Sequence, residues 1–341
     1  MVQMRKEASI EQWKTLYETA TRIKEMKPWE KFWDLDLIGI RTGAEEDTVF
    51  FSILGRGGDC YGIAVYEGYE GLNSFLMLTM QESMNLSTEY VMFHQKNLTC
   101  YWGNREELTE KQRKIIKDLG YSYRGKNQWL YFLSFEPGYY PYNLDETEVM
   151  RMAEYFQHLE QALHYYNKEK LCIDFEKGNM YLMSLKDNCE TWDYREEPLP
   201  FTAFRFGNLI ITDENLLDDL AKSPRCDAVL EAETIVMNAK VTDKEYDKPA
   251  NPAMIILCET KMGQVVNCDM TRPEDDPMVM LAEVLIDFIF RYGAPKEIRV
   301  SNVIVEAGLE QICGVCGIKL RRMKKLKEID SFLRGMSRFG F

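Results

Sequence analysis

The sequence contains little histidine and no long apolar run. Its 341 residues include three histidines, and no stretch reaches the ~18 consecutive apolar residues that a membrane-spanning helix needs. The N-terminal residues also lack the apolar core of a secretory signal peptide. We therefore expect no membrane span, no membrane partner and a cytoplasmic location.

A metal site built on histidine is disfavoured as well. His158 and His164 are six residues apart, so they point to different sides of the helix predicted over residues 145–167. No third ligand lies near them in the sequence, and metal sites in proteins use three or four ligands. Nothing in the sequence points to general-base chemistry at either histidine or at His94.

The nine cysteines are scattered, and one pair of them, Cys313 and Cys316, has the CxxC spacing. A structural zinc site needs four ligands, and no second CxxC or His-x₃-His follows. With Leu309 and Ile312 the pair falls on one face of a helix predicted over residues 305–316. We expect reduced cysteines that mostly pack as small apolar residues, and we expect the pair to pack in the core without redox or metal chemistry.

The composition is that of a globular protein with a sizeable core. Hydrophobic residues make up 45% of the chain, aromatic residues 12% and charged residues 28%. The length suggests about two domains, and neither repeats nor low-complexity tracts occur. The net charge of −13 excludes a protein that coats nucleic acid with its whole surface.

The order of predicted elements divides the chain in three. We expect an α+β domain over residues 1–170, a connector over 171–199 that includes a strand near 180–185, and an α/β domain with a mixed five-stranded sheet over 200–341. In the first domain, Ser9 and Gln12 form a capping box that opens a helix. The elements expected after it are strands at 37–41, 48–54 and 61–66, a helix near 69–82, a strand pair near 90–103, a helix at 106–119, a strand at 128–135 and a helix from 145 to about 167.

The C-terminal half has a more informative order. Short strands are expected at 201–206 and 208–212, a helix at 214–222 and a β-rich run at 228–240. A hairpin follows at 253–271, then a helix at 277–292 that is apolar at nearly every position, then a strand at 297–301, the helix at 305–316 and a strand at 318–323. A helix with so narrow a polar stripe is expected to lie between a sheet and other structure.

This order resembles the RNase H-like fold, and more narrowly the integrase core of transposases. The matching text is Tyr292-Gly293-Ala294-Pro295 before a strand that ends at Ser301-Asn302, and then Ile312-Cys313 and Cys316-Gly317-Ile318. The whole chain also resembles members of an uncharacterised bacterial two-domain family of unknown function, with Pro28-Trp29, Tyr61-Gly62-Ile63 and Val65-Tyr66-Glu67-Gly68 in its N-terminal half.

The RNase H-like resemblance implies a site for two divalent metals, held by carboxylates on the first strand, at the end of the fourth strand and on a late helix. The first place matches Glu231 or Glu233. The fourth-strand place matches Ser301 or Asn302, neither of which carries a charge. The late-helix candidates are Glu328 and Asp330. Glu259 and Asp269 are two further acids from which a displaced carboxylate set could be built.

Charge reverses at the C-terminal end. Residues 319–341 hold eight basic residues and two acidic ones, a net charge of +6. The basic residues Arg321, Arg322, Lys324, Lys325 and Lys327 are candidate contacts for nucleic acid or an acidic protein partner, with Phe332, Phe339 and Phe341 available for stacking. A tail that docks on the chain's own acidic surface, or stays solvated, explains the same charges.

The missing acid favours a non-catalytic binding or scaffold module, without cofactor, on a degenerate RNase H-like fold. The alternative is a metal-dependent nuclease that uses Mg²⁺ or Mn²⁺ and the displaced set Glu231, Glu233, Glu259 and Asp269. On the first reading the protein is not an enzyme. The sequence does not identify the substrate, the partner or the role of the N-terminal domain.

Overall fold

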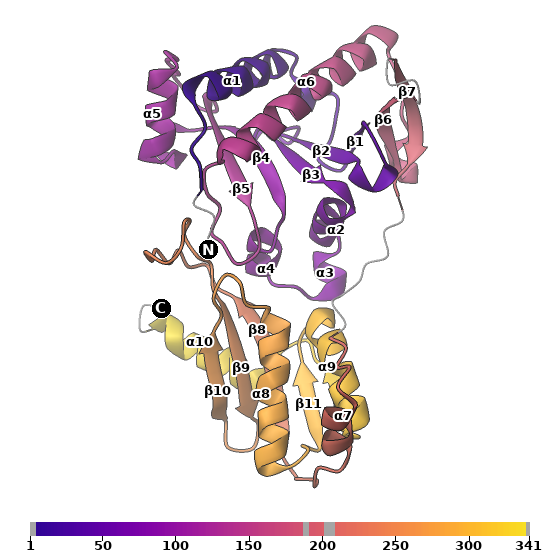
Figure 1. The fold of residues 1–341 in the computed structure, drawn as a ribbon, viewed down its shortest axis with the longest axis vertical. Coiled ribbons are helices and arrows are strands. Elements are labelled where there is room, and N and C mark those ends of the chain that lie inside the picture. The colour runs from indigo at the N-terminus through magenta and orange to yellow at the C-terminus, as the bar shows by residue number, and fades with distance from the viewer. Residues whose placement is uncertain (1–4, 187–190, 201–208, 339–341) are drawn as a thin grey trace. The chain divides into compact units, whose positions relative to one another are not determined.

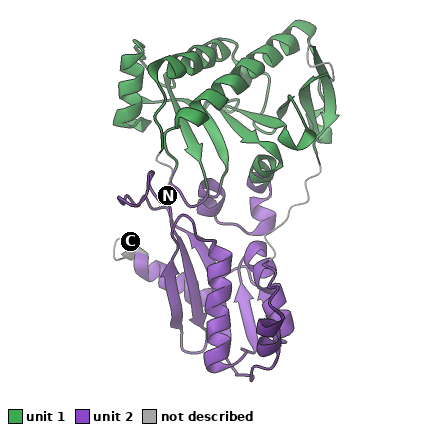
Figure 2. Cartoon of the chain, viewed as in Figure 1, with its two compact units in different colours: residues 1–76, 95–136, 141–202 green, residues 77–94, 137–140, 203–341 purple. Residues whose placement is uncertain are grey.

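The computed structural model describes residues 5–186, 191–200 and 209–338. The strand expected at 201–206 and the side chains of Phe339 and Phe341 therefore lie outside the described residues. The chain divides into two compact units (Figures 1 and 2). Unit 1 comprises residues 1–76, 95–136 and 141–202, and unit 2 comprises residues 77–94, 137–140 and 203–341.

Unit 1 is built on a mixed seven-stranded sheet with the strand order β5-β4-β3-β2-β1-β6-β7. β1 pairs with β6 in parallel, and the other neighbours are antiparallel. The strands are β1 (Ile38–Arg41), β2 (Val49–Leu54), β3 (Gly62–Glu67), β4 (Asn97–Gly103), β5 (Trp129–Phe135), β6 (Asn179–Leu185) and β7 (Trp192–Pro198). The helices are α1 (Ile10–Glu25), α2 (Gly68–Thr79), α5 (Glu110–Asp118) and α6 (Glu146–Glu169).

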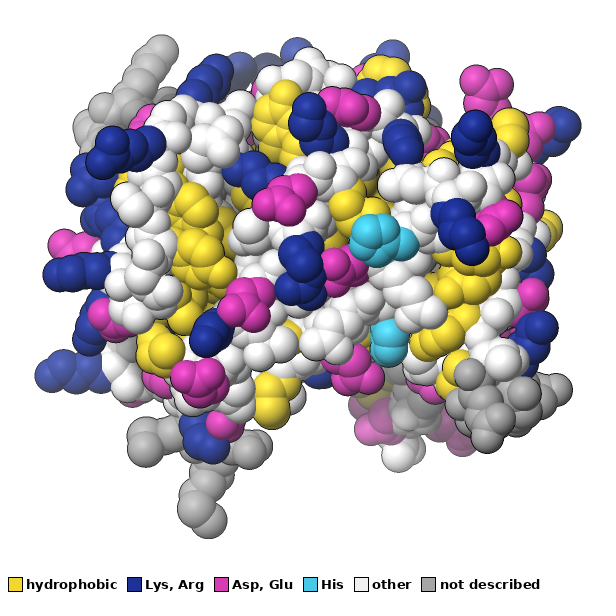
Figure 3. All heavy atoms as spheres, turned by 90° about the horizontal axis from the view of Figure 1, so that it is seen from above, with side chains coloured by type: hydrophobic (Ala, Val, Ile, Leu, Met, Phe, Trp, Pro, Cys, Tyr) yellow, Lys and Arg dark blue, Asp and Glu magenta, His cyan; other side chains and the backbone are white. Residues whose placement is uncertain are grey.

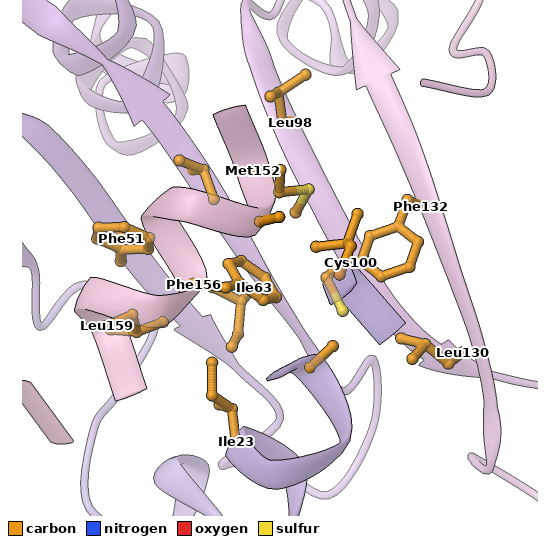
Figure 4. Close-up of a cluster of buried hydrophobic side chains, with 14 of the residues drawn as sticks. Ile23, Phe51, Ile63, Leu98, Cys100, Leu130, Phe132, Met152, Phe156 and Leu159 are labelled. Atoms are coloured by element: carbon orange, nitrogen blue, oxygen red, sulfur yellow. The ribbon is translucent and has the colours of Figure 1, made fainter. Parts of the chain in front are cut away.

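The alternation of β2 explains how unit 1 buries both faces of its sheet. Phe51 and Ile53 pack in the larger core with the apolar faces of α1 and α6, whereas Phe50 packs on the opposite face with α2. Successive side chains of a strand point to opposite faces, so a strand with apolar residues on both faces needs helices on both sides. Figure 4 shows the larger core, with Phe156 and Met152 of α6 against Ile63 and Cys100 of the sheet. The expected capping box at Ser9 is confirmed.

The segment expected to be a connector contains two strands of this sheet. β6 and β7 occupy much of residues 171–199 and pair from Asn179↔Pro198 to Leu185↔Trp192. β7 escaped the sequence analysis because its charged residues and terminal proline give no apolar alternation. β7 lies at the edge of the sheet, where charged side chains are common, and Arg195 forms ion pairs with Asp193 and Glu197. Its strand conformation therefore depends on backbone pairing with β6 and not on an apolar pattern of its own.

Unit 2 contains a mixed five-stranded sheet with the order β10-β9-β8-β11-β12. β8, β9 and β10 are antiparallel neighbours, and β11 is parallel to both β8 and β12. The strands are β8 (Val229–Val236), β9 (Ala253–Glu259), β10 (Gln264–Met270), β11 (Glu297–Val300) and β12 (Lys319–Arg322). The helices are α3 (Gln81–Met84), α4 (Thr88–Phe93), α7 (Glu214–Ala221), α8 (Pro277–Tyr292), α9 (Val303–Val315) and α10 (Lys327–Arg338).

Helices cover both faces of the sheet in unit 2. α8 and α9 pack on one face, where Leu281, Leu285 and Ile289 are fully buried with Leu309 and Ile312. Cys313 and Cys316 lie in the same core, which confirms that they pack as small apolar residues. α10 packs through Leu326, Ile329 and the residues that follow onto the other face, formed by Met254, Ile256 and Cys258. The expected hairpin at 253–271 is present.

A short segment from the N-terminal half belongs to unit 2. Residues 77–94 contain α3 and α4. The prediction of a strand pair near 90–103 is therefore wrong for its first strand, because these residues belong to α4, and β4 is the one strand in this range. Ser87 accepts a hydrogen bond from the Tyr90 amide and begins α4. Leu86 and Val91 then pack with Val303 and Ile304 at the start of α9, so contacts distant in sequence decide the conformation.

The surface seen in Figure 3 carries basic and acidic side chains side by side, with small apolar areas between them. Such interspersed charge is typical of a solvated face. Among the helices in the described segments, none combines the length and the apolar character needed to cross a lipid bilayer.

Candidate functional site

The site is built around β8, whose two glutamates share one face of the sheet. Leu230 and Ala232 point into the core beneath α8 and α9. Glu231 and Glu233 alternate with them and therefore point to the face that α10 covers. Both glutamates are buried, with 3% and 6% of their surface exposed. Buried carboxylates are costly unless hydrogen bonds satisfy them, so their partners define what each one does.

Glu231 holds the beginning of α10. Its Oε2 accepts hydrogen bonds from the backbone amides of Glu328 at 2.8 Å and Ile329 at 3.0 Å. These amides belong to the first turn of the helix, where N–H groups have no partner within the helix and negative charge is favoured. The carboxylate is thus engaged in joining β8 to α10.

Glu233 lies beside the carboxyl end of β11. The parallel register of β8 and β11 pairs Glu231 with Arg299, so Glu233 falls level with Ser301. Ser301 Oγ donates to one carboxylate oxygen, and Asn302 Nδ2 donates to the other at 2.8 Å. The amide of Thr234 also donates, at 3.0 Å. Burial raises the pKa of Glu233 to about 7, although these hydrogen bonds favour the charged form.

Asn302 has two roles that require an amide. Its Oδ1 caps α9 by accepting from the amides of Ile304 at 3.0 Å and Val305 at 3.1 Å, while its Nδ2 donates to Glu233. An aspartate could cap the helix equally well but has no hydrogen to donate. Asn302 therefore both begins α9 and satisfies one carboxylate oxygen of Glu233.

These groups border a hollow of about 340 Å³ in unit 2, which we call the Glu233 site. Its polar lining includes Glu233, Ser301, Asn302, Lys324, Lys325 and Asp330. The structure thus brings together the first-strand, fourth-strand and late-helix places that the sequence singled out. The late-helix carboxylate here is Asp330, whereas Glu328 forms an ion pair with Lys327 at 3.2 Å.

Glu259 and Asp269 lie on the other face of the sheet. Glu259 is the pairing partner of Leu230 and Asp269 that of Ile255, and both partners point into the core beneath α8. Glu259 accepts from the amides of Lys261 and Met262 in the hairpin turn, and Asp269 accepts from Asn267. The four acids named as a displaced set are therefore not brought together. Within the described residues, no three His, Cys, Asp or Glu side chains are grouped so that they could hold a metal ion.

The basic residues of the C-terminal end divide into two groups. Arg321 pairs with Glu297 at 3.7 Å and Arg322 with Glu306 at 3.4 Å, and Lys327 pairs with its neighbour Glu328. Lys324 and Lys325 border the Glu233 site, and across the described part of the chain neither forms an ion pair. Two of the five candidate basic residues are thus available at the site.

The sequence analysis missed the contribution of α3 and α4. Asn85 follows α3 in the left-handed conformation and donates its Nδ2 hydrogen to the carbonyl oxygen of Ser301 at 2.7 Å. Ser87 and Tyr90 complete this side of the hollow. No sequence signal pointed to them, because they lie more than 200 positions before Ser301 in a segment expected to belong to the other domain.

Residues 13–183, half of the chain, match the family model described as Domain of unknown function (DUF7309). The chain belongs to this family. Residues 216–337 match a second model, Domain of unknown function (DUF6930), which spans α7 to α10 and thus contains Glu233, Ser301 and Asn302. The DUF7309 match includes residues 77–94, which supply Asn85 and Tyr90 to unit 2. No curated protein matches the chain.

Two solved structures of retroviral proteins are similar to part of the chain. One is the intasome of simian T-cell lymphotropic virus in complex with PP2A regulatory subunit B56 gamma, at 13% identity, over 32% of this chain and 39% of that chain, with a TM-score of 0.24. The other is the HTLV-2 integrase catalytic core domain in complex with magnesium, at 12% identity, over 33% of this chain and 70% of that chain, with a TM-score of 0.24.

Proposed function

We propose that unit 2 is a degenerate RNase H-like domain that binds a nucleic acid phosphate at the Glu233 site without cleaving it. The observation that carries this proposal is the pairing of Glu233 with Ser301 and Asn302. The succession of three antiparallel strands, helix, strand, helix and strand supports the RNase H-like part.

The donor chemistry at this site does not suit the two divalent cations of such nucleases. Mg²⁺ prefers carboxylate and other oxygen ligands. Here Asn302 directs an N–H hydrogen at Glu233 and uses its oxygen on α9, and the hydroxyl of Ser301 also donates to Glu233. A raised pKa of about 7 leaves Glu233 protonated in a large fraction of molecules at neutral pH.

The same groups favour an anion. Lys324 and Lys325 supply two positive charges at the border of the hollow against the one carboxylate of Asp330, and a lysine ammonium is a common point contact for phosphate. A protonated Glu233 removes the repulsion that a carboxylate would exert on a phosphate. Ser87 and Thr234 add hydroxyl groups to the lining. A nucleic acid backbone, which repeats such phosphates along its length, is the ligand that we assign to this surface.

The first test concerns metal and cleavage. We expect calorimetric titration of the full chain with Mg²⁺ or Mn²⁺ at neutral pH to show no tight site. The reason is that Glu233 is the one strand carboxylate of this site that could bind a metal, since Glu231 is bonded to the amides of α10. We expect Asn302→Asp to destabilise the protein, since two carboxylates then face each other, and added Mn²⁺ to restore part of the loss. Metal-dependent nucleic acid cleavage by the wild-type chain that Glu233→Gln abolishes would contradict the proposal and favour the nuclease.

The second test concerns the phosphate contacts. Binding of single- and double-stranded DNA and RNA oligonucleotides is measured by fluorescence anisotropy over a range of salt concentrations. We expect Lys324→Gln/Lys325→Gln to weaken binding and to lower the slope of log affinity against log salt by about 1.5, the release expected for two phosphate contacts.

The matched control for this test is Lys261→Gln/Lys296→Gln, which removes two exposed lysines of unit 2 outside the hollow. Equal weakening by both double variants would indicate a general effect of charge and contradict a phosphate site. Binding of polyglutamate as tight as that of the oligonucleotides would instead assign the two lysines to an acidic protein.

A further inference from the structure

A second hollow in unit 2, with a volume of about 370 Å³, shares Tyr90 and Thr234 with the Glu233 site but is not lined by Glu233 or the two lysines. It is enclosed by α4, by the loop that leads from β10 into α8 and by the neighbouring ends of β8 and β9. Its volume falls in the range of about 300–1,000 Å³ that is typical of sites for small organic molecules. We call it the His94 cavity, after the histidine in its wall.

One wall is aromatic and carries unused polar atoms. The rings of Tyr90 and His94 stack with centroids 4.7 Å apart and planes inclined by 19°, and Phe93 lies beside them. In the part of the chain that is described, neither the Tyr90 hydroxyl nor the His94 imidazole forms a hydrogen bond. Burial lowers the pKa of His94, so its ring is neutral at physiological pH and does not repel a cation.

The opposite wall is acidic. Glu274, Asp275 and Asp276 line the cavity together with a single arginine, Arg272. Asp276 begins α8 by accepting from the amides of Met278 at 2.7 Å and Val279 at 3.3 Å, both through Oδ1. Its second carboxylate oxygen remains for a ligand, and its negative charge acts on both His94 and Tyr90.

A buried hydroxyl adds a directional group. Thr271, which is 8% exposed, accepts a hydrogen bond from the Ala253 amide at 2.9 Å. Thr271 also lines the cavity. A hydroxyl oxygen has two lone pairs, so the one that the Ala253 amide does not use is available to an N–H group of a bound molecule. Pro273, Pro277, Met278 and Ile304 make the remaining lining largely apolar.

We propose that the His94 cavity binds a small organic cation that has a flat apolar body and one protonated amine. The amine pairs with Asp276, and the body lies against the rings of Tyr90, Phe93 and His94, which attract a cation through their π faces as well as by apolar contact. A flat anion of the same size would meet three carboxylates and one arginine, so the charge of the lining selects against it.

The test uses phenethylamine as the probe and the full chain as the target. Its neutral and anionic counterparts, 2-phenylethanol and phenylacetate, have a similar ring and length. We expect saturation-transfer NMR and calorimetry to detect phenethylamine at millimolar or lower concentration and to detect the other two at least tenfold more weakly. Absence of phenethylamine binding, or equal binding of phenylacetate, would overturn the proposal.

Two matched variants separate binding from folding. Asp276→Asn keeps a good N-cap and removes the charge, so we expect at least a tenfold loss of phenethylamine affinity with little change in the melting temperature. Asp213→Asn makes the same change at the start of α7, where Asp213 caps the amides of Asn215 and Leu216 outside the cavity. An equal loss in both variants, or none in Asp276→Asn, would show that Asp276 does not hold the amine.

Discussion

Unit 2 is expected to lose about 3 kcal/mol of unfolding free energy as the pH rises from 4.5 to 8, and Glu233→Gln is expected to remove most of this loss. The folded-state pKa of Glu233 is about 7, raised by burial above the ordinary value of 4.5. Below pH 4.5 both the folded and the unfolded state carry the proton. Between the two values the folded state retains a proton that the unfolded state has released, so stability falls as the pH rises.

The magnitude follows from about 1.4 kcal/mol per pKa unit. The readout is the difference between wild type and Glu233→Gln, because other groups titrate in the same range. Glutamine has nearly the same shape and can accept from Asn302, but it has no charge to bury. A wild-type chain whose stability rises between pH 5 and 8 relative to the variant would contradict the assignment of Glu233 as a buried carboxyl held mainly neutral.

The chain offers two controls for this measurement. All six tryptophans lie in unit 1, so tryptophan fluorescence follows urea unfolding of unit 1 alone, while circular dichroism follows both units. Glu297→Gln is the matched substitution in unit 2. The neighbouring Arg299 lowers the pKa of Glu297, so this carboxylate adds stability above its unfolded pKa, and the fall expected between pH 4.5 and 8 remains in that variant.

Leu285→Ala is expected to lower the unfolding free energy of unit 2 by about 2–5 kcal/mol. Leu285 lies on the face of α8 that packs against β9 and β8, and its side chain is fully buried with Leu257, Leu281 and Ile289. Truncation removes the transfer free energy of three carbons and leaves a cavity that a close-packed core fills only in part. Urea unfolding followed by circular dichroism measures the loss.

The comparison for Leu285 is an apolar side chain on the outer face of the same helix. Phe290 is 50% exposed, and we expect Phe290→Ala to change stability by less than about 1 kcal/mol, because alanine also favours the helix. Similar losses of unfolding free energy in the two variants would show that the two faces of α8 are equally buried, and would contradict packing on the sheet through the Leu285 face. A loss below about 1 kcal/mol for Leu285→Ala would contradict the packing that positions β8 and Glu233.

The sequence alone determined those helices and strands whose buried and exposed positions follow a regular local pattern of apolar and polar residues. The helix expected over 277–292 is present, with its polar residues Glu283, Asp287 and Arg291 recurring every four positions, and so is the hairpin expected over 253–271. The cysteine pair was placed correctly for the same reason. The meeting of Glu233 with Ser301 and Asn302 was anticipated only through the RNase H-like resemblance, which left the choice between Glu231 and Glu233 open.

The tertiary structure determined the conformation of segments without a local pattern and the hydrogen-bond partners of the buried carboxyl groups. β7 is a strand because β6 supplies its hydrogen bonds, and α4 is a helix partly because Val303 and Ile304 complete its apolar cluster. Glu231 and Glu233 are chemically alike and two positions apart, yet one caps α10 and the other faces Ser301. Hydrogen-bond partners, and with them the pKa and the role of a buried carboxyl, come from segments distant in sequence, because burial leaves a charged group only the neighbours that the fold brings to it.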